Sequence, residues 1–181
     1  PFAWCLSFSR DSNTIWMGTQ PGIYSISQIT HTAVYHNPRV MQNRTVRQIV
    51  EDKYGNLWMG TQSLGVFKWS AAKGKKNFDN GVSQFKGVPA TLITKITVDR
   101  KGYVWVATSA SGVYVIDPSI DKVMLHLGTE EPPERKLTWN GTASVFQYDD
   151  TTMVIAANGI YLYNTRLQRI SSFVKMPETI P

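Results

Sequence analysis

One short phrase occurs three times along the chain, and a weaker fourth copy follows. The copies share two apolar runs separated by a glycine or a small polar turn, and they occupy residues 13–26, 55–69, 102–116 and 151–164. Their common anchor positions are Trp16, Trp58, Trp105 and Val154. Successive anchors are 42, 47 and 49 residues apart, so the chain repeats itself with a period in the forties.

This period predicts an all-β fold made of β-propeller blades, each a four-stranded antiparallel sheet. One repeat cannot bury both faces of its sheet alone, so neighbouring repeats must stack. We therefore interpret residues 1–181 as a partial β-propeller, about four blades of a larger one. The blades are expected at about 1–43, 44–90, 91–137 and 138–181. Because the chain opens at Pro1 inside a repeat-like phrase, we expect a piece of a longer protein.

The second repeat shows the strand pattern most clearly. Its first strand alternates, with Val46, Gln48 and Val50 expected on one side of the sheet. Two further strands follow, and a shorter fourth strand is expected over residues 75–81. No segment of the chain is expected to form a helix.

Residues at matching positions of the repeats have structural roles in this interpretation. The tryptophans offer flat faces for packing between adjacent blades. Gly18 and Gly60 allow another backbone or ring to approach closely. An aspartate recurs near the first turn of each blade, at Asp11, Asp52, Asp99 and Asp149. Four such aspartates could form a cation site or a catalytic ring, but recurrence at one structural position favours turn formation.

The formal net charge of +6 is placed unevenly. Residues 44–90 carry eight Lys or Arg against three Asp or Glu, and much of this excess lies in 71–78. The excess is consistent with an acidic partner, such as nucleic acid or a charged polysaccharide, or with a solvated hairpin turn. The lysines flank a glycine as they would in a surface turn, which favours the turn. Nucleic-acid binding is not expected, because the basic run lacks interleaved aromatic residues.

The remaining reactive side chains indicate neither a cofactor nor a metal. The lone cysteine, Cys5, excludes an internal disulfide, and its place in an apolar strand predicts a buried thiol. His31, His36 and His126 fall in comparable parts of different blades and lack the spacing of a metal site. No apolar run is long enough to span a bilayer, and no signal peptide is visible.

The second repeat resembles the two-component regulator propeller repeat. The matching positions are Asp52, Gly55, Asn56, Trp58, Gly60, Thr61, Gly65 and Phe67. The third repeat also matches well, with Ala107 as its departure, whereas the fourth keeps Asp149, Gly159 and Tyr161. The resemblance covers essentially the whole chain.

This resemblance implies the extracytoplasmic sensor region of a Bacteroidetes-type hybrid two-component histidine kinase. Such proteins carry propellers outside the inner membrane, followed by a membrane helix and cytoplasmic kinase modules. The implied location is periplasmic, and the implied ligands are oligosaccharides. The chain itself shows no phospho-acceptor histidine motif, so the membrane and kinase parts would lie in absent parts of the full-length protein.

A ligand of a propeller binds where the loops between second and third strands gather with the connectors between blades. The candidate ligand-binding residues there are Gln20, Arg39, Gln42, Arg44, Gln62, Lys86, Arg135 and Trp139. Amide and guanidinium groups bind ring hydroxyls, and an aromatic plate binds the C–H face of a sugar. Trp139 is the best candidate plate, although a connector tryptophan can also fill the gap between blades. Residues 130–136 are interpreted as solvated connector, with a mobile lid or a partner contact as the alternatives.

Three functions compete at this point. A ligand-sensing module without catalysis is favoured, and a protein-interaction scaffold is the alternative. A propeller glycosidase or lyase is disfavoured, because no pair of opposed carboxylates stands out from the turn aspartates. In all three cases a partial propeller exposes sheet faces at both ends. We therefore expect self-association, or docking with the missing half, through the terminal blades.

Overall fold

The computed structural model describes residues 2–74 and 77–175, and it contains four antiparallel four-stranded sheets. Blade 1 consists of β1 (Ala3–Phe8), β2 (Thr14–Thr19), β3 (Ile23–Ser27) and β4 (Ala33–His36). Blade 2 consists of β5 (Val46–Glu51), β6 (Leu57–Thr61), β7 (Val66–Trp69) and β8 (Val82–Phe85). Blade 3 consists of β9 (Ile93–Val98), β10 (Val104–Thr108), β11 (Val113–Asp117) and β12 (Lys122–Leu127). Blade 4 consists of β13 (Ser144–Gln147), β14 (Thr152–Ala156), β15 (Gly159–Asn164) and β16 (Arg169–Lys175). The predicted all-β fold of four-stranded antiparallel blades is confirmed.

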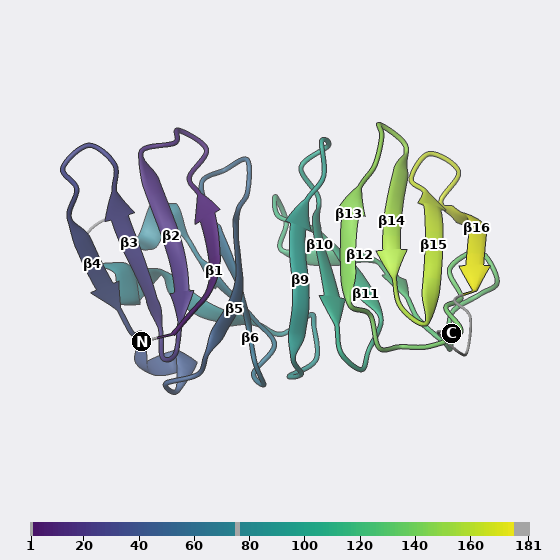
Figure 1. Ribbon diagram of the computed structural model, residues 1–181, viewed down its shortest axis with the longest axis horizontal. Helices are drawn as coiled ribbons and strands as arrows, with labels where there is room; N and C mark the ends of the chain where they lie inside the picture. The colour runs from purple at the N-terminus through teal and green to yellow at the C-terminus, as the bar shows by residue number, and fades with distance from the viewer. Residues whose placement is uncertain (1, 75–76, 176–181) are drawn as a thin grey trace, which may run out of the picture.

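The blades stack in chain order. Within each sheet the strands lie in sequence order, so the first and fourth strands are its two edges. The first strand of each blade contacts the first strand of the next, from β1 through β5 and β9 to β13. Figure 1 shows β4 and β16 at opposite ends of the molecule. Blades 1 and 4 therefore each have one sheet face that no other blade covers.

Each blade has one face toward the preceding blade, here called the leading face, and one toward the following blade, called the trailing face. In blade 2 the leading face carries Ile49, Met59 and Phe67, which are neighbours across β5, β6 and β7. The trailing face of the same blade carries Trp58 and Val66. Both faces are apolar because the sheet is covered on both sides, which explains the continuous apolar runs in the sequence.

Three apolar clusters fill the three junctions between blades. Trp58 and Trp105 are buried at the second and third junctions, as predicted. Trp58 packs with Val104 and Val106 of blade 3, and Trp105 packs with Ile155 of blade 4. Burial of a large apolar side chain stabilises by about 1.5–3 kcal/mol, so the anchors hold neighbouring blades together.

The predicted fourth strand of blade 2 is misplaced. The strand is β8 at Val82–Phe85, and residues 75–76 of the predicted segment lie outside the described residues. A single helical turn, α1 (Ala71–Gly74), and a 3-10 turn, η2 (Phe78–Gly81), precede β8, so the expectation of no helix is also wrong. The 3-10 turn forms because the side chain of Asn77 accepts a hydrogen bond from the Asp79 backbone N–H at 2.9 Å. It places Phe78 in a stack with Trp69, with ring centroids 5.2 Å apart.

The alternation predicted for β5 is interrupted. The register shifts between Val46 and Gln48, and both Val46 and Ile49 are buried. Strands β1 and β9 show a register shift near the corresponding position. A bulge of this kind adds one residue on one strand and increases its twist, so side chains beyond it change sides.

The predicted close approach at Gly18 and Gly60 is confirmed. A Cβ atom at Gly18 would lie 2.5 Å from the carbonyl oxygen of Val46. A Cβ at Gly60 would lie 2.5 Å from Cγ2 of Ile93. Both contacts involve the first strand of the following blade, so these glycines set how closely neighbouring blades pack.

The four recurrent aspartates form turns, as predicted. In blade 1 the carboxylate of Asp11 accepts from the backbone N–H of Asn13 at 2.9 Å. Asp52, Asp99 and Asp149 accept from backbone N–H groups of their own turns at 2.8–3.0 Å. These carboxylates are therefore used by the fold rather than gathered into one site.

Candidate functional site on the connector face

The loops between second and third strands lie against the connectors between blades, which creates the predicted loop face. The backbone N–H of Gly65 donates to the Thr91 carbonyl at 3.1 Å, and that of Gly112 donates to the Asn140 carbonyl at 2.8 Å. Gly22 makes the same kind of bond with Arg44, at 3.4 Å. All three glycines have φ between +71° and +75°, so a side chain at these positions would be strained. Each hairpin is thus attached to the connector that enters the following blade.

Trp139 stands out on this face, because its side chain is 61% exposed. It lies on the connector between blades 3 and 4, beside Gly141. A Cβ atom at Gly141 would lie 2.4 Å from Nε1 of Trp139 and 3.1 Å from the carbonyl oxygen of Ser109. The glycine therefore gives the indole room to lie along the connector near the β10–β11 loop. The indole is not a plug between blades, which leaves its ring open to a ligand.

Hydrogen bonds fix the side chains of the two residues that flank Trp139 in the sequence, Thr138 and Asn140. The hydroxyl of Thr138 bonds Oδ1 of Asn158 at 2.9 Å and the hydroxyl of Tyr161 at 2.6 Å. The Tyr161 hydroxyl also accepts from the backbone N–H of Thr138 at 2.9 Å. On the other side, the Asn140 side chain bonds the backbone and side chain of Thr129, each at 2.9 Å. We call Trp139, Thr138 and Asn158 the Trp139 shelf. Neither Thr138 nor Asn158 is among the candidate ligand-binding residues predicted from the sequence.

The other predicted residues gather in separate groups. Arg39, Gln42 and Arg44 lie in and after the 3-10 turn η1 (Arg39–Met41), all exposed on the connector between blades 1 and 2. Gln20 is exposed on the neighbouring β2–β3 loop. Among the described residues, no hydrogen bond or ion pair joins this group to the Trp139 shelf. A ligand that spans both groups must cross the loops of blade 2, where Gln62 is exposed.

The guanidinium of Arg135 is paired with a carboxylate of its own connector. Its guanidinium lies 3.3 Å from Oε2 of Glu131, and the other oxygen of Glu131 lies 2.9 Å from Nδ1 of His126. Nε2 of His126 in turn lies 2.7 Å from the Ser111 carbonyl. These contacts attach the 130–136 connector to blade 3, which argues against a mobile lid there.

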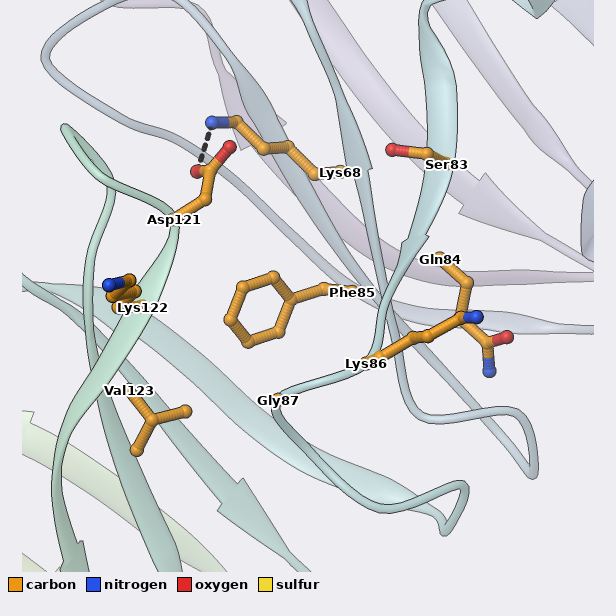
Figure 2. Close-up of a pocket in the computed structure, with 9 residues that line it drawn as sticks. All are labelled: Lys68, Ser83, Gln84, Phe85, Lys86, Gly87, Asp121, Lys122 and Val123. Atoms are coloured by element: carbon orange, nitrogen blue, oxygen red, sulfur yellow. Dashed lines mark hydrogen bonds and ion pairs between the residues drawn. The ribbon is translucent and has the colours of Figure 1, made fainter.

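Lys86 lies in a different place, beside a groove between the outer strands of blades 2 and 3 (Figure 2). The groove has a volume of about 590 Å³ and lies between β8 and the start of β12. Figure 2 shows Phe85 pointing toward β12, whereas Lys86 and Gln84 lie on the other side of β8. Gln84 donates to the Leu64 carbonyl at 2.9 Å, so this amide is already used. Among the described residues, no hydrogen bond or ion pair joins Lys86 to the sugar-binding groups predicted with it.

An ion pair between blades closes one end of the groove. Nζ of Lys68 lies 2.5 Å from Oδ1 of Asp121, and the same ammonium lies 5.1 Å from the ring centre of Trp58. The Lys68 side chain is 13% exposed, whereas that of Asp121 is 53% exposed on a turn. The floor is apolar, formed by Phe85 and Val123. The sequence could not reveal this groove, because strands of two different repeats form it.

Neither a metal site nor a membrane-spanning helix is found in the part of the chain that the structure describes. No group of three His, Cys, Asp or Glu side chains there could hold a metal ion. No described helix is long and apolar enough to cross a membrane. Cys5 is half-buried on the trailing face of β1, and burial raises the pKa of its thiol. A thiol with a raised pKa is a poor nucleophile at neutral pH.

The repeat and the fold now allow comparison with known proteins. Residues 41–63 match the family model for the two component regulator propeller. This segment therefore resembles a two component regulator propeller repeat. The resemblance drawn from the sequence of the second repeat is therefore confirmed, and the structure shows three further blades of the same architecture. No curated protein sequence matches the chain.

Solved structures share the fold at low sequence identity. The extracellular domain assigned to a hybrid two component system of B. thetaiotaomicron aligns with 96% of this chain at 15% identity, with a TM-score of 0.74. A second extracellular domain from the same organism, assigned to a one component system, aligns at 19% identity with a TM-score of 0.69. Virginiamycin B lyase from Staphylococcus aureus aligns with 97% of this chain at 14% identity, with a TM-score of 0.73.

The aligned proteins are longer than this chain. The chain covers 24% and 21% of the two B. thetaiotaomicron domains, and 56% of the lyase. The chain is thus a propeller fragment that resembles extracellular domains of two-component sensors. At these identities the likeness establishes the fold alone.

Proposed function

We propose that this propeller fragment is a ligand-sensing module of a periplasmic sensor, and that its ligand is an oligosaccharide. The full-length protein would be a hybrid two-component histidine kinase in the inner membrane. The fragment itself would bind without catalysis. Support comes from the repeat at residues 41–63 and from the likeness to extracellular sensor domains.

The observation that carries the proposal is the Trp139 shelf. An indole that is 61% exposed presents a flat apolar surface to solvent. The hydroxyl of the adjacent residue Thr138 is held in place by its bonds to Asn158 and Tyr161. Sugars need this combination, because their C–H faces stack on aromatic rings while their hydroxyls exchange hydrogen bonds.

The test is direct binding to neutral and acidic oligosaccharides, followed by calorimetry and saturation-transfer NMR. We expect Trp139→Ala to weaken binding at least tenfold, which corresponds to about 1.4 kcal/mol. Trp4→Ala is the matched control, because Trp4 is also exposed but lies on β1 and stacks under Arg47 at 4.1 Å. This control should bind as the unchanged protein does. Equal losses in both variants, or none in Trp139→Ala, would contradict the assignment of the shelf.

A second candidate is a protein-interaction scaffold, which the exposed end faces of blades 1 and 4 favour. A scaffold would show no binding to any oligosaccharide in the panel. A lyase activity rests only on a shared fold with virginiamycin B lyase. Incubation with the bound oligosaccharides, followed by mass spectrometry, should show unchanged sugars. New products would replace the sensor proposal with an enzymatic one.

A further inference from the structure

The leading face of blade 1 is apolar and uncovered. Its central positions are Leu6, Phe8, Ile15, Met17, Tyr24 and Ile26, and none of the ladder positions on this face carries a charge. Leu6 is 66% exposed and Phe8 is 61% exposed. At the corresponding positions of blade 2, by contrast, Leu57, Met59 and Phe67 are buried under blade 1. Blade 1 therefore presents the same kind of surface that blade 2 hides.

The trailing face of blade 4 is the counterpart. It presents Phe146, Val154, Ile160, Leu162 and Val174, and its one charged ladder residue is Arg169, which pairs with Asn164 at one end of the sheet. Phe146 and Val174 are 48% and 57% exposed. Contiguous exposed apolar surface of this kind marks an interaction site in a soluble protein.

The three junctions inside the chain show which surfaces fit together. At each one, the trailing face of one blade packs against the leading face of the next. At the third junction the trailing face supplies Trp105, and the leading face supplies Met153, Ile155 and Tyr163, whose ring centroid lies 5.8 Å from that of Trp105. No junction inside the described chain pairs two leading faces or two trailing faces.

The two end faces offer the same kinds of side chain as the faces inside these junctions. In blade 3, Trp105 on the second strand is paired across the sheet with the small Thr97 on the first. In blade 4 the ring is on the first strand and the smaller side chain is on the second, because Phe146 on β13 is paired with Val154 on β14. The trailing face of blade 4 thus still offers a ring. The leading face of blade 1 offers Ile15 and Met17 where blade 2 has Leu57 and Met59, together with the rings of Phe8 and Tyr24.

We propose that a second copy of this chain covers both faces, in a head-to-tail arrangement. The trailing face of blade 4 in each copy packs on the leading face of blade 1 in the other, and the two junctions together close one ring. The argument is continuity, because each new junction repeats the three junctions already present within one chain. A two-fold arrangement closes such unlike surfaces, whereas repeated addition without closure would give filaments. This inference concerns assembly and does not depend on the proposed sugar binding.

The first experiment is light scattering over a range of protein concentrations. We expect a molar mass of twice the 20.4 kDa of the single chain. Leu6→Glu and Phe146→Glu each place a charge on one end face, and each should weaken the dimer at least tenfold. Both positions are exposed in the single chain, so circular dichroism should show an unchanged fold. Ile120→Glu is the matched control, because Ile120 is also exposed but lies on a turn of blade 3, and it should leave the dimer intact.

Mixing the two variants separates head-to-tail pairing from like-with-like pairing. Leu6→Glu keeps a normal trailing face on blade 4, and Phe146→Glu keeps a normal leading face on blade 1. A mixture should therefore form a one-to-one complex through a single normal junction, which mass spectrometry or a size-tagged copy detects. If either variant alone still dimerises fully, the faces pair like with like and the proposal is wrong.

Two other outcomes would also overturn the proposal. A monomer at all concentrations with a native fold would mean that the faces do not bind a second copy. Added blades of the same repeat type are the other possible occupant. A longer chain that carries them would be monomeric and would show Leu6 and Phe146 protected from surface labelling. Such protection without dimerisation would assign the faces to that longer chain.

Discussion

The indole N–H of Trp58 donates a hydrogen bond to Oδ2 of Asp52, six residues earlier, at 2.9 Å. The same pair recurs in blade 3, where Trp105 donates to Asp99 at 2.9 Å. One buried carboxylate thus holds the turn between first and second strands and also fixes the ring that packs on the following blade. The recurrent aspartate is therefore coupled to blade stacking, which a turn role alone does not explain.

Blade 1 lacks this coupling. Asp11 accepts from Ser9 at 2.6 Å and from Asn13 at 2.9 Å, and it lies exposed. No described residue accepts from the buried Nε1 of Trp16. The loop of blade 1 has Ser12, with φ of 59°, where blade 2 has its Gly-containing turn, and this different turn holds the carboxylate away from the ring.

Removal of the two aspartates should therefore have unequal costs. Asp52→Ala leaves the buried indole N–H of Trp58 and two backbone N–H groups without their acceptor. We expect the free energy of unfolding to fall by about 2–4 kcal/mol, since each buried unpaired group costs about 1–3 kcal/mol. Asp11→Ala is the matched control and should cost less than about 1 kcal/mol. Urea unfolding measures both, and equal costs would mean that the Asp52–Trp58 bond adds nothing.

Gly60→Ala should loosen the junction between blades 2 and 3. The added Cβ would lie 2.5 Å from Cγ2 of Ile93, so either the side chain or the whole first strand of blade 3 must move. Overpacking of a filled core costs about 1–3 kcal/mol, and we expect thermal unfolding to show that loss. Ala107→Gly, at the matching position of blade 3, should cost no more than about 1 kcal/mol. A neutral Gly60→Ala would show that the junction adapts.

Acid should weaken the junction between blades 1 and 2. His36 stacks on Phe78 with ring centroids 4.2 Å apart, and burial lowers the pKa of its imidazole, although nearby Asp79 partly opposes the shift. In the unfolded chain the imidazole has its ordinary pKa of about 6.5. Below that pH the unfolded chain binds more protons than the folded one. The contribution of His36 to the free energy of unfolding is therefore complete above that pH and falls as the pH drops below it. Urea unfolding at pH 5 and pH 7.5 measures this fall.

The matched pair for that experiment is His36→Gln and His31→Gln. His36→Gln should reduce the difference in stability between the two pH values. His31→Gln should leave the difference unchanged, because His31 is exposed on a turn. A pH dependence that persists in His36→Gln would assign the effect to other groups.

The ion pair across the groove should contribute little to stability. Asp121 is half exposed on a turn, so solvent screens its attraction for the ammonium of Lys68. We expect Asp121→Asn to change the free energy of unfolding by less than about 1 kcal/mol. Lys68→Ala should cost more than that, because it also removes the contact of the Lys68 ammonium with the Trp58 ring. If Asp121→Asn cost the same as Lys68→Ala, the charge pair would account for the whole effect.

The strands could be predicted well from the sequence, because the repeat gives several aligned copies of each strand. Each of the four repeated phrases contains the second and third strands of its blade to within one residue. The prediction was wrong for the fourth strand of blade 2, where the chain inserts α1 and η2 before β8. Fourth strands are edge strands with few apolar positions, so their pattern is weak. Residues 77–81 carry turn-forming Asn, Asp and Gly, which should have lowered the expectation of a strand.

The candidate site was harder to predict than the fold. Trp139 could be identified because it is an aromatic residue outside the repeat pattern. Its neighbour Thr138 gave no signal, since a threonine in a connector is common and its bond to Tyr161 depends on the packing of blade 4. Lys86 was grouped with the sugar-binding candidates because of its place in a connector. It instead lies in the turn directly after β8, on the side opposite Phe85 (Figure 2).

The hydrogen bonds that join each hairpin glycine to the next connector have a mechanical consequence. A connector that a ligand displaces would pull on the hairpin of the blade before it, through Gly65 or Gly112, and on the first strand of the blade after it. A displaced connector therefore moves two adjacent blades together rather than one. A displacement of one connector on the loop face would therefore move both neighbouring blades, and through their own connectors it would reach the next blades in the stack.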